Sequence, residues 1–166
     1  MIVEDELFSR FRGKDILLDT NLLLLFLVGS FERQRIHKFK RTAEFSEADF
    51  DLLARFLQEF RKILTTPHIL TEVSNLTNSL PSHLQKLWST HFARQTNAFL
   101  EIFEASEMLM KRGVFHQFGL ADAAIHSLSS DALVLTEDFR LAGFLRSENL
   151  PVLNFRELAM VSRFLG

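Results

Sequence analysis

The stretch ILLDTNLLLLFLV, residues 16–28, decides the fold of this chain. Its first three residues are apolar and follow the turn-forming residues 13–15, so they predict a short buried strand. The apolar run at residues 22–28 precedes Gly29 and predicts a helix that ends near that glycine. We therefore expect the chain to pass from a strand directly into a helix, with Asp19 at the junction.

The same pairing of strand and helix recurs along the chain. Apolar or β-branched runs predict further strands at residues 62–65, 132–136 and 151–154. Periodic apolar positions and capping residues predict helices at residues 46–60, 67–78, 89–111, 118–129, 139–146 and 156–164. Strands and helices in this order favour the α/β class, with a parallel sheet flanked by helices.

Size and composition fit a single domain. The chain has 166 residues, short enough for one core, and 47% of them are hydrophobic. A net charge of −2 gives no overall positive field, so any contact with nucleic acid must be local. The absence of cysteine excludes disulfides, thiolate zinc sites and a cysteine nucleophile.

The N-terminus and the apolar runs indicate a cytoplasmic protein that is not in a membrane. The first residues, MIVEDE, lack the basic region of a signal peptide. The apolar run at residues 22–28 is shorter than the roughly 20 residues needed to cross a bilayer. A chain without cysteine also fits a reducing compartment.

Four acidic residues occupy positions where an α/β sheet binds ligands. Asp19 and Asp138 each follow a predicted strand, while Glu72 and Asp122 lie near the starts of predicted helices. Ligands of open α/β sheets bind outside the carboxyl ends of the strands. Each acid also has a structural interpretation. Asp19 and Asp138 suit helix caps, Asp122 suits a cap or the first turn of a helix, and Glu72 suits the positive end of a helix dipole.

The four acids carry more information as a set than singly. Two unit charges about 4 Å apart repel by about 4 kcal/mol at an effective dielectric constant of about 20. A cluster of four carboxylates therefore requires cations or protonation. Oxygen ligands without cysteine or paired histidines suit Mg²⁺ or Mn²⁺ rather than zinc. Such an ion can lower the pKa of a water molecule and stabilise charge on a phosphodiester.

The acids lie in four short segments that follow one another in a characteristic order. The segments are ILLDTNLL at residues 16–23, PHILTEV at 67–73, GLADAAI at 119–125 and LTEDFRL at 135–141. In this order they resemble the motifs of the PIN-domain family, which includes compact ribonuclease toxins. The segment LPVLNFREL at residues 150–158 is similar to the last strand and terminal helix of that family.

The resemblance implies a Rossmann-like, three-layer α/β/α sandwich and an endoribonuclease that depends on Mg²⁺ or Mn²⁺. Asp19, Glu72 and Asp122 would hold the metal directly or through water. Asp138 would complete the acidic pocket or bind a second ion. The resemblance further implies a homodimer and, for a toxin, a protein antitoxin as the partner that neutralises it.

Two polar residues beside the acids would orient the carboxylates by hydrogen bonds, namely Asn21 and Thr136. Local turn and cap bonding is the alternative interpretation of both. Glu137 is an alternative candidate for the fourth acid. Asp138 is favoured, because it follows Thr136 by two residues, and a Thr or Ser precedes the acid by two in the family.

Two segments depart from the compact toxins of the family. Residues 1–14 form an N-terminal extension, and residues 30–45 form a basic insertion, within a single domain of residues 1–166. The insertion is the candidate for phosphate contact. Its basic residues are Arg33, Arg35, Lys38, Lys40 and Arg41.

Aromatic character in the basic insertion adds a second feature of RNA binding. His37 and Phe39 would stack on single-stranded bases. The alternative interpretation is a solvated face whose charges pair with nearby acids such as Glu32 and Glu44.

Three classes of function compete for this pattern. The first is a metal-dependent endoribonuclease, with the toxin of a toxin–antitoxin pair as its setting. The second is a non-catalytic PIN-fold module that binds RNA or protein; all four acids are retained, which favours the enzyme. The third is a phosphatase with an aspartate nucleophile, which usually needs a second aspartate two residues later, where this chain has Asn21.

Overall fold

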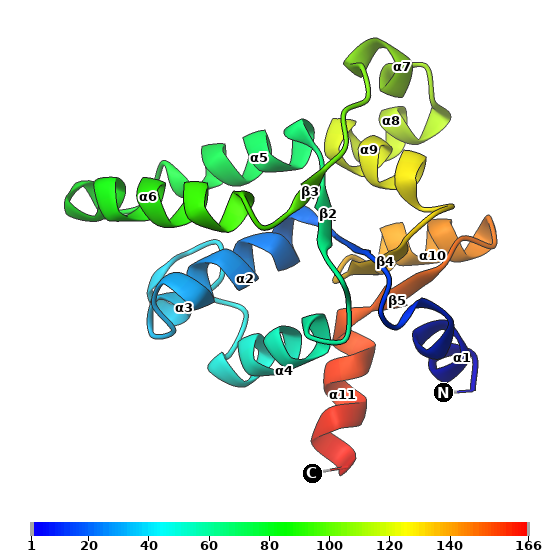
Figure 1. The fold of residues 1–166 in the computed structure, drawn as a ribbon, viewed down its shortest axis with the longest axis horizontal. Coiled ribbons are helices and arrows are strands. Elements are labelled where there is room, and N and C mark those ends of the chain that lie inside the picture. The colour runs from blue at the N-terminus through cyan, green and yellow to red at the C-terminus, as the bar shows by residue number, and fades with distance from the viewer. Residues whose placement is uncertain (1, 166) are drawn as a thin grey trace.

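A five-stranded, all-parallel sheet forms the centre of the molecule (Figure 1). The structure is a computed structural model that describes the backbone of residues 2–165 and the side chains of residues 5–162. The order of the strands is β3-β2-β1-β4-β5. Their bounds are β1 Ile16–Leu18, β2 Ile63–Thr65, β3 Leu100–Glu101, β4 Leu133–Thr136 and β5 Val152–Asn154.

The predicted opening strand is the middle strand of this sheet. Ile16 pairs with Ile63 of β2 on one side and with Leu133 of β4 on the other. All three residues of β1 and all four of β4 are buried. Continuous apolar strands of this kind are typical of parallel sheets covered on both faces. The structure thus confirms the predicted α/β class.

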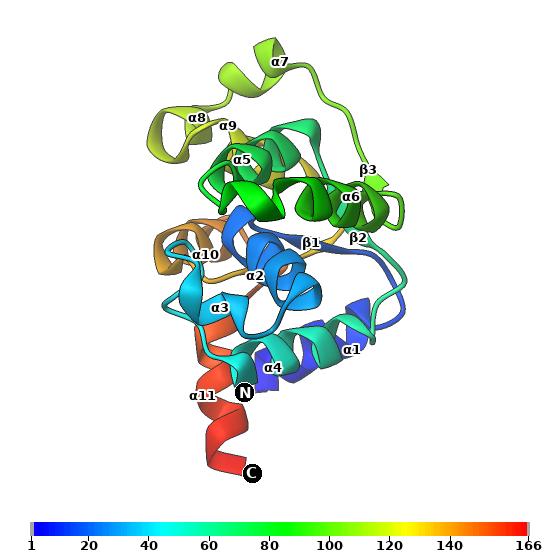
Figure 2. The same ribbon diagram turned by 90° about the vertical axis from the view of Figure 1, so that its left-hand side faces the viewer.

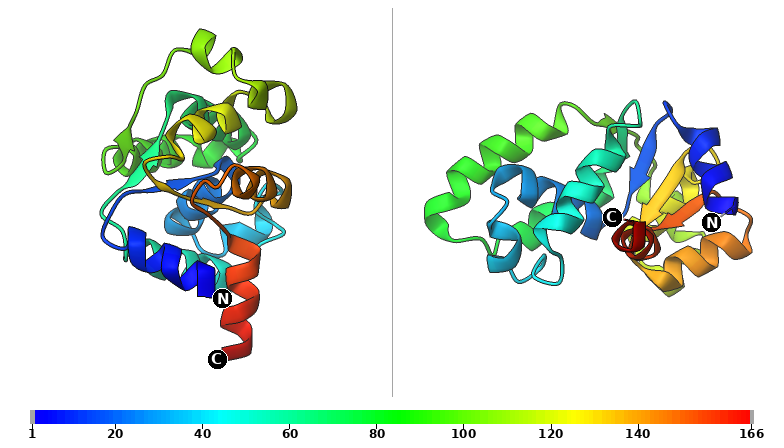
Figure 3. Two further views of the ribbon diagram at one scale, coloured as in Figure 1. Left: turned by 90° about the vertical axis from the view of Figure 1, so that its right-hand side faces the viewer. Right: turned by 90° about the horizontal axis from the view of Figure 1, so that it is seen from below.

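Helices cover both faces of the sheet and make three layers (Figures 2 and 3). One layer contains α2 Thr20–Phe31, α3 Arg35–Lys38, α4 Glu47–Leu57, α5 Pro67–Thr77 and α6 Gln85–Thr96. The other contains α9 Leu120–Leu128 and α10 Phe139–Ser147. The remaining helices are α1 Ile2–Phe11, η1 Ser82–Leu84, α7 Ser106–Met110, α8 Gly113–Phe118 and α11 Phe155–Leu165. The predicted three-layer α/β/α sandwich is confirmed.

Helix α2 is the centre of its layer because it is apolar on nearly every side. It contacts α4, α5 and α6, and most of its residues are buried. A helix that is hydrophobic all round is stable only when it is enclosed. The helix does not end at Gly29 as predicted but continues to Phe31. A Cβ atom at Gly29 would overlap the ring of Phe50, so this glycine permits close packing rather than ending the helix.

The predicted continuous helix at residues 89–111 is wrong, because only residues 89–96 and 106–110 of this range are helical. Helix α6 ends at Thr96, and the chain then forms the edge strand β3. This strand has two residues and is defined by its pairing with Leu64 and Thr65 of β2. Because the pairing joins residues far apart in the sequence, local periodicity could not reveal it.

The N-terminal extension packs against the fold. Residues 2–11 form helix α1, and Phe8 places its ring 5.5 Å from that of Phe56 and 6.1 Å from that of Phe60. Phe11 is buried in the main core. Within residues 2–165, no helix combines the length and apolarity needed to cross a membrane.

Candidate functional site

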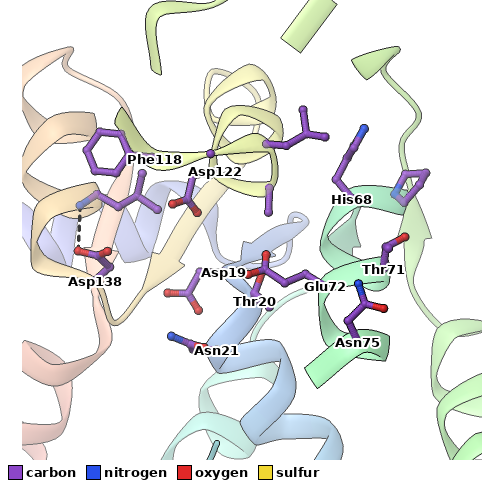
Figure 4. Close-up of a pocket in the computed structure, with 15 residues that line it drawn as sticks. Asp19, Thr20, Asn21, His68, Thr71, Glu72, Asn75, Phe118, Asp122 and Asp138 are labelled. Atoms are coloured by element: carbon purple, nitrogen blue, oxygen red, sulfur yellow. Dashed lines mark hydrogen bonds between the residues drawn. The ribbon is translucent and has the colours of Figure 1, made fainter. Parts of the chain in front are cut away.

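A pocket of about 510 Å³ opens at the carboxyl edge of the sheet (Figure 4). All four predicted acids line it: Asp19, Glu72, Asp122 and Asp138. They come from the end of β1, from α5, from α9 and from the end of β4. Among the side chains that the structure describes, no lysine or arginine contributes to the wall of this pocket. The pocket therefore concentrates negative charge.

Asp19 is 5% exposed and is fixed by three hydrogen bonds. Its Oδ1 accepts from the backbone N–H of Leu22 at 2.8 Å, so Asp19 is the N-cap of α2. Its Oδ2 accepts from the Thr136 hydroxyl at 2.5 Å and from the Glu137 N–H at 2.8 Å. A carboxylate has about four acceptor positions. The capping interpretation is thus correct, and one position on Oδ1 is still available for a ligand.

Thr136 contacts two of the acids and makes both the predicted bond to a carboxylate and the local turn bond that was the alternative. While its hydroxyl donates to Asp19, the same oxygen accepts from the backbone N–H of Asp138 at 3.0 Å. Asp138 in turn caps α10, because its Oδ1 accepts from the N–H groups of Arg140 and Leu141 at 2.6 and 3.2 Å. The Thr-x-Asp spacing therefore fixes the relative positions of Asp19 and Asp138.

Glu72 is held by a residue that the sequence analysis missed. The hydroxyl of Thr20 donates to Glu72 Oε2 at 3.0 Å and so joins α2 to α5. Glu72 lies beyond the first turn of α5, so the helix-dipole interpretation is wrong. Asn21 lines the pocket but, in the described part of the chain, donates to none of the four acids. A helix turns by about 100° per residue, which directs Thr20 rather than Asn21 toward α5.

Asp122 experiences the repulsion of the other three acids. Burial, followed by the charges of Asp19, Glu72 and Asp138, raises the pKa of Asp122 to about 7. Of its two structural interpretations, the helix cap is wrong, because Gly119 occupies the N-cap position of α9, whereas the first-turn acid is confirmed.

Burial also raises the pKa of Asp19 to about 6, although its hydrogen bonds from Thr136, Leu22 and Glu137 oppose that rise. Two carboxyl groups in one pocket thus hold protons far above the usual range of aspartate. A bound cation would relieve this cost by stabilising the charged forms.

Carboxylate oxygens suit an ion such as Mg²⁺, but the side chains are spread around the pocket. Within the described residues, no group of three or more His, Asp or Glu side chains is placed to hold one ion together. Carboxylates that lie too far apart to bind one ion directly can still reach it through its bound water. Mg²⁺ commonly binds in this way, since it keeps several of its waters.

Glu137 is excluded as a substitute for Asp138. Its carboxylate forms an ion pair with Arg156, with nitrogen–oxygen distances of 2.6 and 3.0 Å. Its backbone carbonyl accepts from the side-chain amide of Asn154 at 3.3 Å. The carboxylate of Glu137 is therefore bound to α11 rather than directed into the pocket, although its backbone N–H donates to Asp19.

Two of the five basic residues of the insertion pair with neighbouring acids. Arg33 pairs with Asp51 at 2.5 Å, and Arg35 pairs with Glu32 at 2.6 Å. Phe39 is 5% exposed, so the prediction that it stacks on RNA bases is wrong. Lys38, Lys40 and Arg41 are exposed, and their contact with RNA stays a prediction. No residue of the insertion lines the pocket.

Several polar residues of the pocket come from one face of α5. His68, Thr71 and Asn75 line the pocket together with Glu72. Spacings of three and four residues place side chains on the same side of a helix. The spacing is visible in the sequence, so these residues could have been predicted to line the pocket once Glu72 was placed in it.

Comparisons with known proteins identified no relative of this chain. No family model matches the sequence, and neither the curated proteins nor the solved structures gave a significant match. The resemblance to PIN domains therefore stays a prediction from the sequence motifs.

Proposed function

We propose that this chain is a PIN-type endoribonuclease that depends on Mg²⁺ or Mn²⁺. One observation carries the proposal: four carboxylates from separate parts of the sequence line one pocket whose described wall has no lysine or arginine. Such a pocket is unfavourable for stability and suits a divalent cation. Sites that are costly to the fold are frequently functional.

The four acids would divide the task of holding the ion. Asp19 has a free acceptor position on Oδ1, and Asp122 accepts no cap bond, so these two aspartates are the candidates for direct ligands. Glu72 and Asp138 would act through water. When bound, the ion would supply a Lewis acid that lowers the pKa of water and stabilises charge on a phosphodiester.

Hydroxyl groups would keep the carboxylates in a productive orientation. Thr136 donates to Asp19, and Thr20 donates to Glu72. Groups behind metal ligands typically affect metal affinity or activity by about 10- to 100-fold. Both threonines are therefore assigned as positioning residues.

A cleavage assay separates the enzyme from a non-catalytic RNA- or protein-binding module. Single-stranded and structured RNA would be incubated with the native chain in Mg²⁺, Mn²⁺ or EDTA, beside Asp19→Asn and Asp122→Asn. Asp131→Asn is the matched control, because Asp131 is an exposed aspartate outside the pocket. We expect cleavage that requires metal, is lost in the two pocket variants and is retained in the control. RNA binding without cleavage would instead support the binding module.

The proposal extends to a biological setting. The PIN resemblance supports a cytoplasmic toxin that is a homodimer and is neutralised by a protein antitoxin. Growth arrest on expression, relieved by the product of an adjacent small gene, would test the toxin. Sedimentation of the purified chain would test the dimer.

A further inference from the structure

Arg140 places a positive charge beside the acidic pocket. Its guanidinium carbon lies 5.4 Å from the centre of the Phe118 ring, and Phe118 is part of the pocket wall. The Phe118 ring also packs against Phe144, with 5.3 Å between ring centres. Arg140 is exposed and follows Asp138 by two residues. The contact with Phe118 therefore places the Arg140 guanidinium at the rim of the pocket.

The charge of Arg140 is not used to neutralise the acids. Only its backbone N–H donates to Asp138, at 2.6 Å, and its guanidinium forms no ion pair with any carboxylate among residues 5–162. Arg156 provides a contrast, because it lies over the ring of Phe45 but also pairs with Glu137 at 2.6 Å. Arg140 is thus an arginine at the pocket rim whose donors are available to an external anion.

We propose that Arg140, held against Phe118, binds the RNA phosphate adjacent to the one that is cleaved. This inference rests on the proposed function. The acidic pocket repels the phosphates that flank the reacting one, so a substrate needs a cation just outside it. Arginine suits this role because its planar donors match the geometry of a phosphate. Stacking on Phe118 orients the guanidinium before the substrate arrives.

A structural role for Arg140 predicts a different behaviour. If the arginine only joins α10 to α8, its removal changes stability and leaves the salt dependence of RNA binding unaltered. A phosphate contact instead releases counterions from RNA, so its loss reduces that salt dependence. The slope of log affinity against log salt therefore distinguishes the two roles.

The test measures binding of a fluorescent single-stranded RNA by anisotropy at several KCl concentrations. The full chain carries Asp122→Asn so that the RNA stays intact. In that background, we expect Arg140→Ala to weaken binding several-fold at low salt and to reduce the slope by about 0.7. Arg140→Lys should retain the slope because it keeps the charge.

The matched control is Arg10→Ala. Arg10 also lies over a phenylalanine ring, 5.2 Å from the centre of Phe11, but belongs to α1 and not to the pocket. We expect it to bind RNA as the parent does. An unchanged slope for Arg140→Ala, an equal loss for Arg10→Ala, or no binding by the parent would overturn the inference.

Cleavage by the native chain is measured separately, so the two proposals can fail independently. Metal-dependent cleavage together with an unchanged Arg140→Ala slope overturns the phosphate contact alone. Binding that depends on Arg140, by a native chain that does not cleave RNA, supports the contact and overturns the nuclease.

Discussion

Asp122 is the residue in which the electrostatic cost of the pocket is concentrated. Its pKa is raised from 3.8 to about 7 by burial and by the three neighbouring acids. The folded protein therefore binds this proton more tightly than the unfolded chain does. By linkage, the carboxyl group lowers stability progressively as the pH rises from about 4 to above 7.

Replacing Asp122 by asparagine should consequently stabilise the metal-free protein at pH 8. We expect the midpoint of thermal unfolding to rise by at least about 2 °C, which corresponds to about 1 kcal/mol in a chain of this size. The gain should shrink as the pH falls toward 4, where the native carboxyl group is protonated. Calorimetry in EDTA at several pH values would measure it. A variant that is less stable than the native chain at pH 8 would contradict the assigned repulsion.

The site acids could be predicted from the sequence, but some of their hydrogen-bonding partners could not. The four acids were predictable because each belongs to a short motif at a strand end or helix start. The choice between Thr20 and Asn21 was not, since it depends on the rotation of α2 relative to α5. The pairing of Arg33 with Asp51 joins the turn between α2 and α3 to α4 and has no local signal in the basic insertion.

At the scale of elements, the packing of α2 against α4 determines the inner layer. A Cβ atom added to Gly29 of α2 would overlap the ring of Phe50 in α4. Alanine ordinarily stabilises a helix relative to glycine by about 1 kcal/mol. Here the overlap should outweigh that gain, because excess volume in a packed interior typically costs about 1–3 kcal/mol.

We therefore expect Gly29→Ala to lower the free energy of unfolding in urea. Gly143→Ala in α10 is the matched control, since a Cβ atom there meets nothing within 4 Å. It should leave stability unchanged or raise it by up to about 1 kcal/mol. Equal stabilisation by both alanines would show that α2 and α4 are not packed as described.

Elements were predictable where local sequence specifies them. The strands β1, β2, β4 and β5 match the predicted ranges to within a residue at each end, because their apolar runs are bounded by polar or turn residues. The edge strand β3 could not be predicted. A strand of two residues shows no hydrophobic alternation, and β3 is defined by its pairing with β2. The break between α8 and α9 depends on Gly119, whose φ of +93° favours glycine.

At the scale of the whole molecule, parallel topology brings the acids together. Strands that run in one direction place their carboxyl ends at one edge, so Asp19 and Asp138 meet although the chain between them is long. Repulsion across that edge should be relieved by a divalent ion. Binding to the folded state raises stability by RT ln(1 + [ion]/Kd), about 2.7 kcal/mol at 100 times Kd.

Mn²⁺ should accordingly raise the unfolding temperature of protein prepared in EDTA. The increase should be lost in Asp122→Asn and retained in Asp131→Asn, whose aspartate is exposed and outside the pocket. Thermal scans over a range of Mn²⁺ concentrations would measure the effect. An equal increase in all three proteins would place the ion elsewhere on the molecule.

The most direct test of the four-acid site is the rate at which single-stranded RNA is cleaved in Mn²⁺ by the native chain and by Asp122→Asn. We expect cleavage by the native chain that stops in EDTA, and a rate at least about 1,000-fold lower in the variant, equivalent to about 4 kcal/mol of transition-state stabilisation. Equal rates in the two proteins, or no metal-dependent cleavage by the native chain, would contradict a catalytic role for this pocket.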